Sequence, residues 1–107
     1  MTTRPWPSGT QVTFIIDNAD FTHAGQEIEI VGGIDGLGQW KAGGGLLLSG
    51  AGFPTWTGSV NLPPGATFEF KAVEVEGGQI VQWENGANRS FTVPPSGAAT
   101  VHGSWQR

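Results

Sequence analysis

Short stretches in which apolar and polar residues alternate recur along the chain. In 11–17, Val12, Phe14 and Ile16 fall on one side, and in 27–31 Ile28 and Ile30 do the same. Successive side chains of a β-strand point to opposite faces, so alternation with a period of two is typical of a half-buried strand. The pattern therefore predicts two strands that turn these apolar residues toward a core.

The clearest strand is predicted over 67–73, where Phe68, Phe70 and Ala72 share one face and Glu69 and Lys71 share the other. Proline- and glycine-rich turns separate the remaining segments. Further strands are expected over 46–48 (a short buried run), 55–62, 79–83, 89–93 and 99–105. No window carries a capped helical stripe. The 79–83 strand is expected to pair with the preceding one across a hairpin-like turn at 76–78. Seven or eight short strands predict an all-β fold, an antiparallel, immunoglobulin-like β-sandwich.

The composition narrows the class of protein further. A chain of 107 residues fits one domain, which we place at 10–107, with 1–9 as a tail or linker stub that contains two prolines. The absence of cysteine excludes disulfides and thiolate metal sites. A net charge of −4 and a pI near 4.9 argue against nucleic acid or an anionic membrane as partner. The first residues lack the apolar run of a signal peptide.

The aromatic residues are unusual, since the chain has five tryptophans and no tyrosine. Trp40 closes a glycine-rich turn and Trp83 opens a polar loop. A flat ring beside amides and glycines suits a ligand with an apolar face and a polar rim, and sugars are such ligands. For Trp40, plugging the end of the sandwich is an equal alternative, whereas the polar loop favours exposure of Trp83. Trp56 competes for a place in the core, Trp105 is expected to be a structural lid, and Trp6 receives no function.

No catalytic motif is present. The chain has no Gly-x-Ser-x-Gly elbow, no His-Glu-x-x-His and no P-loop. His23 and His102 are far apart in sequence and lack a clustered carboxylate pattern, which favours surface histidines. A glycosidase needs two opposed carboxylates in a cleft, and short turns offer little cleft. We therefore expect no catalytic residue, no metal and no cofactor.

Six segments occur in an order that resembles the starch-binding domains of carbohydrate-binding module family 20, which are appended to glucoamylases and other amylolytic enzymes. They are Val31-Gly32-Gly33, Leu37-Gly38-Gln39-Trp40, Phe68-Glu69-Phe70-Lys71, Val81-Gln82-Trp83-Glu84, Asn88-Arg89-Ser90-Phe91-Thr92-Val93-Pro94 and a terminal Trp105. The likeness covers roughly 10–107. The family's fold is an antiparallel β-sandwich, in agreement with the alternation.

The resemblance implies one complete sugar site and one incomplete site. The first would consist of two platform rings, a Lys that contacts hydroxyls, and an acid and an amide that orient them, namely Trp40, Trp83, Lys71, Glu84 and Asn88. The second site keeps its tryptophan but lacks the family's tyrosines, because this chain has none. Its candidate residues are Trp56, Phe53 and Phe21. A weak auxiliary contact is expected there.

The resulting expectation is a non-catalytic module that binds α-1,4-glucans such as starch, glycogen, maltooligosaccharides and cyclodextrins. Its partner would be a glycoside hydrolase or related catalytic domain, and its location would be extracellular if that enzyme is secreted. The alternative from another class is a β-sandwich that binds protein through the same exposed tryptophans, since Trp is a leading hot-spot residue. A small glycosidase is a third, less favoured interpretation.

Overall fold

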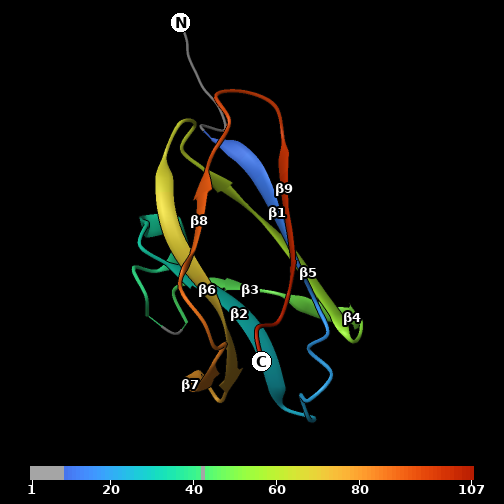
Figure 1. Ribbon diagram of the computed structural model, residues 1–107. Helices are drawn as coiled ribbons and strands as arrows, with labels where there is room; N and C mark the ends of the chain where they lie inside the picture. The colour runs from blue at the N-terminus through green and yellow to red at the C-terminus, as the bar shows by residue number, and fades with distance from the viewer. Residues whose placement is uncertain (1–8, 42) are drawn as a thin grey trace, which may run out of the picture.

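The computed structural model describes residues 9–41 and 43–107. Within these ranges the chain forms short strands and one 3-10 turn, joined by tight loops (Figure 1). The elements are β1 (Thr10–Asp17), β2 (Gln26–Gly32), η1 (Asp35–Leu37), β3 (Leu46–Leu47), β4 (Ser49–Gly52), β5 (Thr55–Leu62), β6 (Thr67–Glu76), β7 (Gln79–Trp83), β8 (Arg89–Thr92) and β9 (Ala99–Ser104). The predicted tail at 1–9, including Trp6, lies outside the described residues apart from Gly9.

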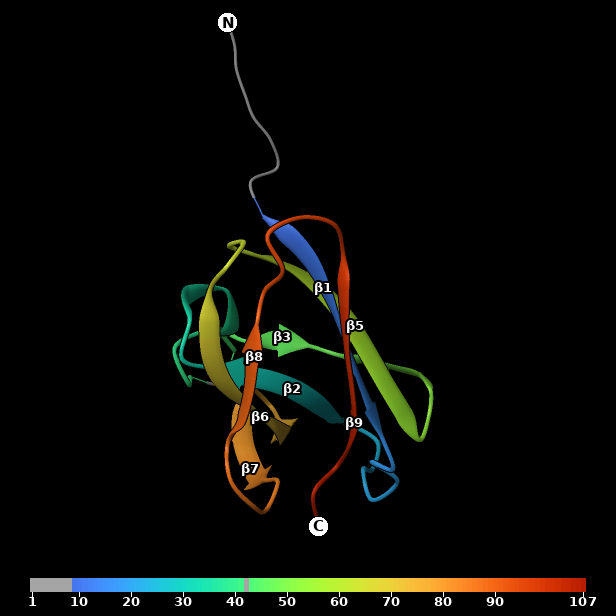
Figure 2. The same cartoon turned by 45° about the horizontal axis from the view of Figure 1, so that its top comes forward.

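The strands build two sheets that pack face to face (Figure 2). One sheet has the order β4-β5-β1-β9, and the other has the order β3-β2-β6-β7, with β8 also paired to β6. The all-β sandwich is thus confirmed. Two details differ from the expectation: β9 runs parallel to β1, and a ninth strand forms at 49–52. That strand, Ser-Gly-Ala-Gly, has no apolar alternation that would have revealed it.

The core lies between the sheets and contains the residues that the alternation placed there. Val12, Phe14 and Ile16 of β1 and Ile28 and Ile30 of β2 are buried, as are Phe68, Phe70 and Ala72 of β6. The rings of Phe14 and Phe70 meet edge to face across the two sheets, with 5.2 Å between their centroids. The hairpin that joins β6 and β7, with Glu76 opposite Gln79, also matches the prediction.

The predicted buried run 46–48 is only partly buried. Leu48 is inside, Leu46 is half-buried, and Leu47 is 51% exposed. The reason is that β3 is a two-residue edge strand in which Leu47 lies opposite Glu29 on the outer face of the sheet. Alternation applies even to this short run, so three consecutive leucines cannot all face the core.

A small second cluster forms on the outer face of the five-stranded sheet. Val31, Val73 and Val75 are buried there, and Trp40 and Ile80 pack against them. The loop that follows β2 therefore lies over the side of β6 that faces away from the sandwich, as both ribbon views show. This cover buries β6 on both faces between Ala72 and Val75, and it places Trp40 on a packed apolar surface. Among the described residues, no helix has the length and apolar character needed to span a membrane.

Candidate carbohydrate-binding site

Trp40 and Trp83 lie beside each other on the outer face of the five-stranded sheet. Their ring centroids are 6.4 Å apart and the ring planes are inclined at 38°. Trp83 is the last residue of β7, lies opposite Val73 of β6 and is 43% exposed. Trp40 is half-buried because it rests on the outer valine cluster. The two rings thus form an angled pair in which Trp83 is exposed and Trp40 is half-buried.

The backbone fixes the orientation of Trp40. Gln39 and Trp40 have φ values of 50° and 71°, in the left-handed region that residues with a side chain rarely adopt. The conformation is held by a hydrogen bond from the Trp40 amide to the Gly32 carbonyl at 3.0 Å. The indole edge lies directly over Gly33, where a Cβ atom would come within 3.1 Å of Nε1 of Trp40. A ring that is held this firmly is preorganised for a ligand.

Lys71 and Asn88 lie on the same side of the sheet as the rings. Lys71 pairs with Val31 in the β2–β6 ladder, and its Nζ donates to the Gly86 carbonyl at 2.6 Å. Nδ2 of Asn88 donates to Oε1 of Glu69 at 3.1 Å. An ammonium group carries three donors and an amide can both donate and accept. Each side chain therefore keeps hydrogen-bonding capacity for a hydroxyl-rich ligand after making its own contact.

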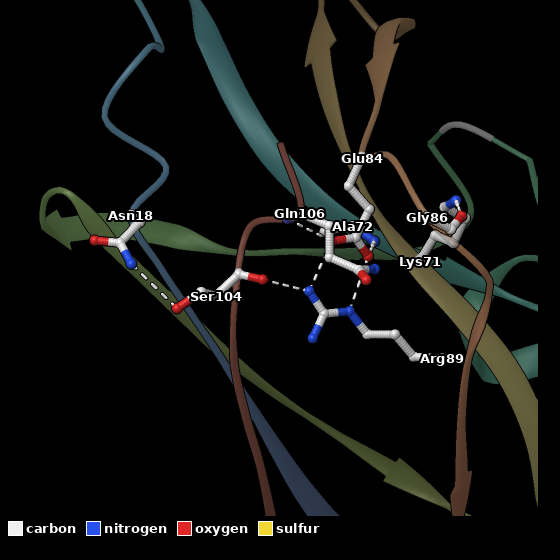
Figure 3. Close-up of polar contacts among 8 residues, drawn as sticks. All are labelled: Asn18, Lys71, Ala72, Glu84, Gly86, Arg89, Ser104 and Gln106. Atoms are coloured by element: carbon white, nitrogen blue, oxygen red, sulfur yellow. Dashed lines mark hydrogen bonds and ion pairs between the residues drawn. The ribbon is translucent and has the colours of Figure 1, made fainter.

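Glu84 does not lie with these residues, and its expected contact with a ligand hydroxyl is wrong. It is 1% exposed, and its carboxylate accepts hydrogen bonds from the Ala72 and Gln106 amides at 2.9 and 3.2 Å. Nε and Nη2 of Arg89 complete a two-pronged ion pair at 2.9 and 2.7 Å, drawn in Figure 3. Burial alone would raise the pKa of Glu84, but these donors outweigh it and hold the pKa below its usual value. A carboxylate enclosed in this way is structural.

The second group of aromatic residues does not form an open platform. Trp56 is only 6% exposed, and its ring is covered by Gly50, where a Cβ atom would come within 2.7 Å of it. Its Nε1 donates to the Ala19 carbonyl at 3.3 Å. Phe21 is half-buried, whereas Phe53 is 52% exposed. The prediction that Trp56 provides an auxiliary stacking surface is wrong, because its ring belongs to the core.

Trp105 is buried, and its ring packs against Phe21 with 4.7 Å between centroids. This packing agrees with the structural lid expected at the end of the last strand. Phe21 therefore serves the lid and does not stand free as a platform ring. Of the three residues considered for a second site, Phe53 alone presents its ring to solvent.

Several polar contacts were not foreseen from the sequence. Glu69 shares the outer face with Lys71 in the alternating pattern, so its proximity to the site could have been inferred. His102 is an exposed residue of β9, as expected for a surface histidine, and its Nε2 lies 2.6 Å from Oδ2 of Asp17. This contact arises from the parallel β1–β9 pairing, which nothing in the sequence indicated. Thr55 and His102 lower the pKa of Asp17 through hydrogen bonds. The pair is a surface feature of the other sheet.

The arrangement suits binding on an open surface. Within residues 9–41 and 43–107 there is no enclosed cavity, and no group of three or more His, Asp or Glu side chains is placed to hold a metal ion. Two inclined indoles share the outer face of the sheet with an ammonium and an amide that retain unused hydrogen-bonding groups. Such a surface matches a ligand that has apolar faces and a rim of hydroxyl groups.

Comparison with known proteins identifies the family. Residues 9–102 match the family model described as starch binding domain. The chain is 44% identical over 104 residues to a thermophilic beta-amylase from Thermoanaerobacterium thermosulfurigenes, covering 94% of this chain and 18% of that protein. It is 42% identical to a cyclomaltodextrin glucanotransferase from Bacillus sp. (strain 38-2), covering 92% of this chain and 14% of that protein. The chain thus spans less than a fifth of either relative's length.

Solved structures give the same result. The family 20 carbohydrate-binding module of a maltotetraose-forming amylase from Pseudomonas saccharophila STB07 superposes with a TM-score of 0.78 and 29% identity, covering 89% of this chain and 99% of that one. A family 15 glucoamylase from Hypocrea jecorina superposes with a TM-score of 0.82 and 26% identity, covering 99% of this chain and 20% of that one. By the family match and these likenesses, the chain belongs to the starch-binding domains of carbohydrate-binding module family 20.

Proposed function

We propose that this module binds α-1,4-linked glucans through the pair formed by Trp40 and Trp83. The observation that supports the proposal is the 38° inclination of two neighbouring indoles 6.4 Å apart. An α-1,4-glucan curves, so adjacent glucose units present faces that are not coplanar, and an inclined pair can follow that bend. A flat glucan such as cellulose would favour coplanar rings. The axial C–H groups would rest on the indoles.

The hydroxyl rim of the ligand would meet Lys71 and Asn88. Lys71 donates one hydrogen bond to the Gly86 carbonyl, and Asn88 donates one to the Glu69 carboxylate. The remaining donors of Lys71 and the carbonyl oxygen of Asn88 are available for vicinal hydroxyls. Glu69 would fix the amide so that Asn88 presents its oxygen. Binding would therefore combine ring stacking with a small number of directed hydrogen bonds.

The role of the module would be to hold a catalytic domain at polysaccharide. The two relatives are named as a beta-amylase and a cyclomaltodextrin glucanotransferase, and the matched part is a small share of each. A binding module that is linked to a catalytic domain raises the local concentration of substrate for that domain. We propose that this module is non-catalytic and raises the local concentration of α-glucan for an enzyme that acts on it.

A titration with β-cyclodextrin, followed by tryptophan fluorescence, tests the proposal. We expect saturable quenching with a Kd of about 1 μM to 0.1 mM, and no response to a cello-oligosaccharide of similar size. Trp83→Ala should lose most of the binding while its circular dichroism spectrum keeps the β-sheet signal. A folded protein that ignores cyclodextrin would contradict the proposal and favour a protein partner for the exposed rings.

A further inference from the structure

The loop that follows Trp83 is anchored to the end of the chain. Residues 84–88 connect β7 to β8 and include Gly86, the acceptor of Lys71, and Asn88. Asn85 donates its amide proton to the Gln106 carbonyl at 2.8 Å, and the Gln106 amide donates to Oε1 of Glu84 at 3.2 Å. The loop and the segment Ser104–Gln106 are therefore joined by one backbone–backbone hydrogen bond and by one from a backbone amide to a side-chain carboxylate.

Arg89 closes the same connection from the other end of the loop. Its guanidinium grips both oxygens of Glu84 and also donates to the Ser104 carbonyl (Figure 3). The side chain of Gln106 lies against Gly86, where a Cβ atom would come within 2.9 Å of its Oε1. Gly86 has a φ of 86°, so a residue with a side chain would be strained there as well.

Glu84 joins this connection to the floor of the site. Its Oε2 accepts from the Ala72 amide at 2.9 Å, and its own amide donates to the Ala72 carbonyl at 3.1 Å. Ala72 stands in β6 between Lys71 and Val73, whose side chains face the ligand side. One buried carboxylate thus links the central strand, the loop and the C-terminal segment.

The charge of this buried group makes the connection rigid. The Glu84 side chain is fully buried and that of Arg89 is 21% exposed, so loss of Arg89 would leave a buried carboxylate without its compensating charge. The loop therefore has a single favourable arrangement as long as Glu84, Arg89 and the C-terminal segment are in place. A loop held this way positions its carbonyl and amide groups with little freedom to lose on binding.

We propose that Glu84, Arg89 and the segment Ser104–Gln106 form a clamp that positions the sugar-binding loop, so that occupation of the site and docking of the C-terminal segment are energetically coupled. The inference rests on the proposed function of the Trp40/Trp83 pair. Glu84, Arg89 and Gln106 are positioning residues, because they act through Gly86 and Asn88. Coupling is reciprocal, so a bound sugar must strengthen docking of the segment by the factor by which docking strengthens binding.

Hydrogen exchange tests the reciprocal effect in the unaltered protein. With saturating β-cyclodextrin, the amides of Asn85 and Gln106 should exchange about 3- to 30-fold more slowly. Amides in β5 serve as the reference because that strand belongs to the other sheet. If cyclodextrin binds but the amides of Asn85 and Gln106 exchange no more slowly, the clamp is overturned. The same holds if exchange slows only at the β5 amides.

Two variants test the clamp from the protein side. The double variant Glu84→Gln/Arg89→Met removes both charges while it keeps similar volume, and its new amide nitrogen faces one of the two backbone donors that bind the carboxylate. Gln106→Pro removes the backbone donor to Glu84 together with the side chain that lies against Gly86, and it keeps both charges of the ion pair. We expect each variant to bind β-cyclodextrin about 3- to 30-fold more weakly. The exciton signal that the neighbouring indoles of Trp40 and Trp83 give in the circular dichroism spectrum should also be weaker. If the double variant does not fold, Gln106→Pro decides the matter.

Arg107→Ala is the matched control, because Arg107 directly follows the segment Ser104–Gln106 but makes an exposed contact to Asn18 and Asp20 instead of the loop. Its affinity should equal that of the unaltered protein. Folded clamp variants with full affinity would overturn the clamp and leave the proposed function intact. An unaltered protein that fails to bind cyclodextrin would overturn the proposed function and the clamp together.

Discussion

Val73 of β6 lies directly opposite Trp83 of β7, and the same side chain belongs to the buried cluster on which Trp40 packs. One residue of the central strand therefore supports both rings. The inclination of the rings is set by a sheet whose other face is packed in the core, where Phe70 and Ala72 are buried. Sites built on regular strands in this way keep their geometry better than sites carried by loops alone.

Removal of either ring should reduce binding. Trp83→Ala and Trp40→Ala are each expected to cost about 1–3 kcal/mol of β-cyclodextrin binding, by analogy with the stacking of bases on aromatic side chains. Calorimetry measures the loss. Phe53→Ala removes an exposed ring from the turn between β4 and β5 and should leave the affinity unchanged. Full affinity in both tryptophan variants would mean that the sugar binds elsewhere.

Gly33→Ala should weaken binding with little effect on stability. The new methyl group would lie 3.1 Å from Nε1 of Trp40 and would push the indole away from its present angle. We expect a loss of about 1 kcal/mol, roughly fivefold in affinity. Gly52→Ala is the matched control, since the nearest heavy atom to its new methyl group is a carbonyl oxygen 3.6 Å away. Equal affinities for the two variants would show that the contact between Gly33 and the Trp40 indole does not influence binding.

Trp56 should govern stability and not soluble-ligand affinity. Trp56→Ala removes a ring that is 6% exposed, and such a truncation costs about 3–5 kcal/mol of unfolding free energy. Trp56→Phe is the milder form and should stay folded with unaltered affinity. Calorimetry with β-cyclodextrin should return one dominant site per chain. Two sites of similar strength, one of them lost in Trp56→Phe, would restore a second site on this face.

Salt should have little influence on binding. The ligand is neutral, so no ion pair forms across the interface and screening has nothing to weaken. The Kd for β-cyclodextrin at low salt and at about 1 M NaCl should agree within a few-fold. A steep loss of affinity with salt would instead indicate an anion site at Lys71, because contacts between charges are strongly salt-dependent.

Glu74→Gln should stabilise the protein at neutral pH. Burial raises the pKa of Glu74; His23 opposes this effect and Glu76 adds to it. A raised folded-state pKa means that the native state disfavours the charged form, so the penalty is absent below the ordinary Glu pKa of about 4.3 and appears as the pH rises. Urea unfolding should give the variant a higher midpoint at about pH 7 and an equal one near pH 4.

The exposed neighbour Glu76 provides the control for this experiment. Glu76→Gln removes a charge from the same strand without relieving burial. It should move the urea midpoint at neutral pH less than Glu74→Gln does. A lower midpoint for Glu74→Gln at pH 7 would show that the carboxylate of Glu74 makes a net favourable contact in the folded protein.

Much of the fold followed from alternation. Val12, Phe14 and Ile16 lie inward as expected, because a period of two fixes the face once the strand is fixed. The parallel pairing of β9 with β1 could not be predicted, since no local pattern records which distant strand is a neighbour. The pair between Asp17 and His102 depends on that pairing and was missed for the same reason.

The exposure of single residues at strand ends and in loops is harder to predict from the sequence than the face of a whole strand. Glu84 follows a platform ring in sequence, which suggested a ligand contact. Because β7 ends at Trp83, the next side chain instead turns under the sheet edge to the Ala72 amide and Arg89. Trp56 was ambiguous by alternation alone, and the burial of its ring beneath Gly50 decided the matter.

The left-handed backbone at Gln39 and Trp40 has a kinetic consequence. Because the ring already stands in place, a sugar needs no loop rearrangement before it docks, and association should approach the rate of simple diffusional encounter. With an association rate constant of about 10⁹ M⁻¹s⁻¹ and the affinity expected above, a bound chain would then reside for only about 10 μs to 1 ms. If the module serves an attached enzyme as proposed, a contact that brief would let the enzyme move from one glucan end to the next without leaving the granule.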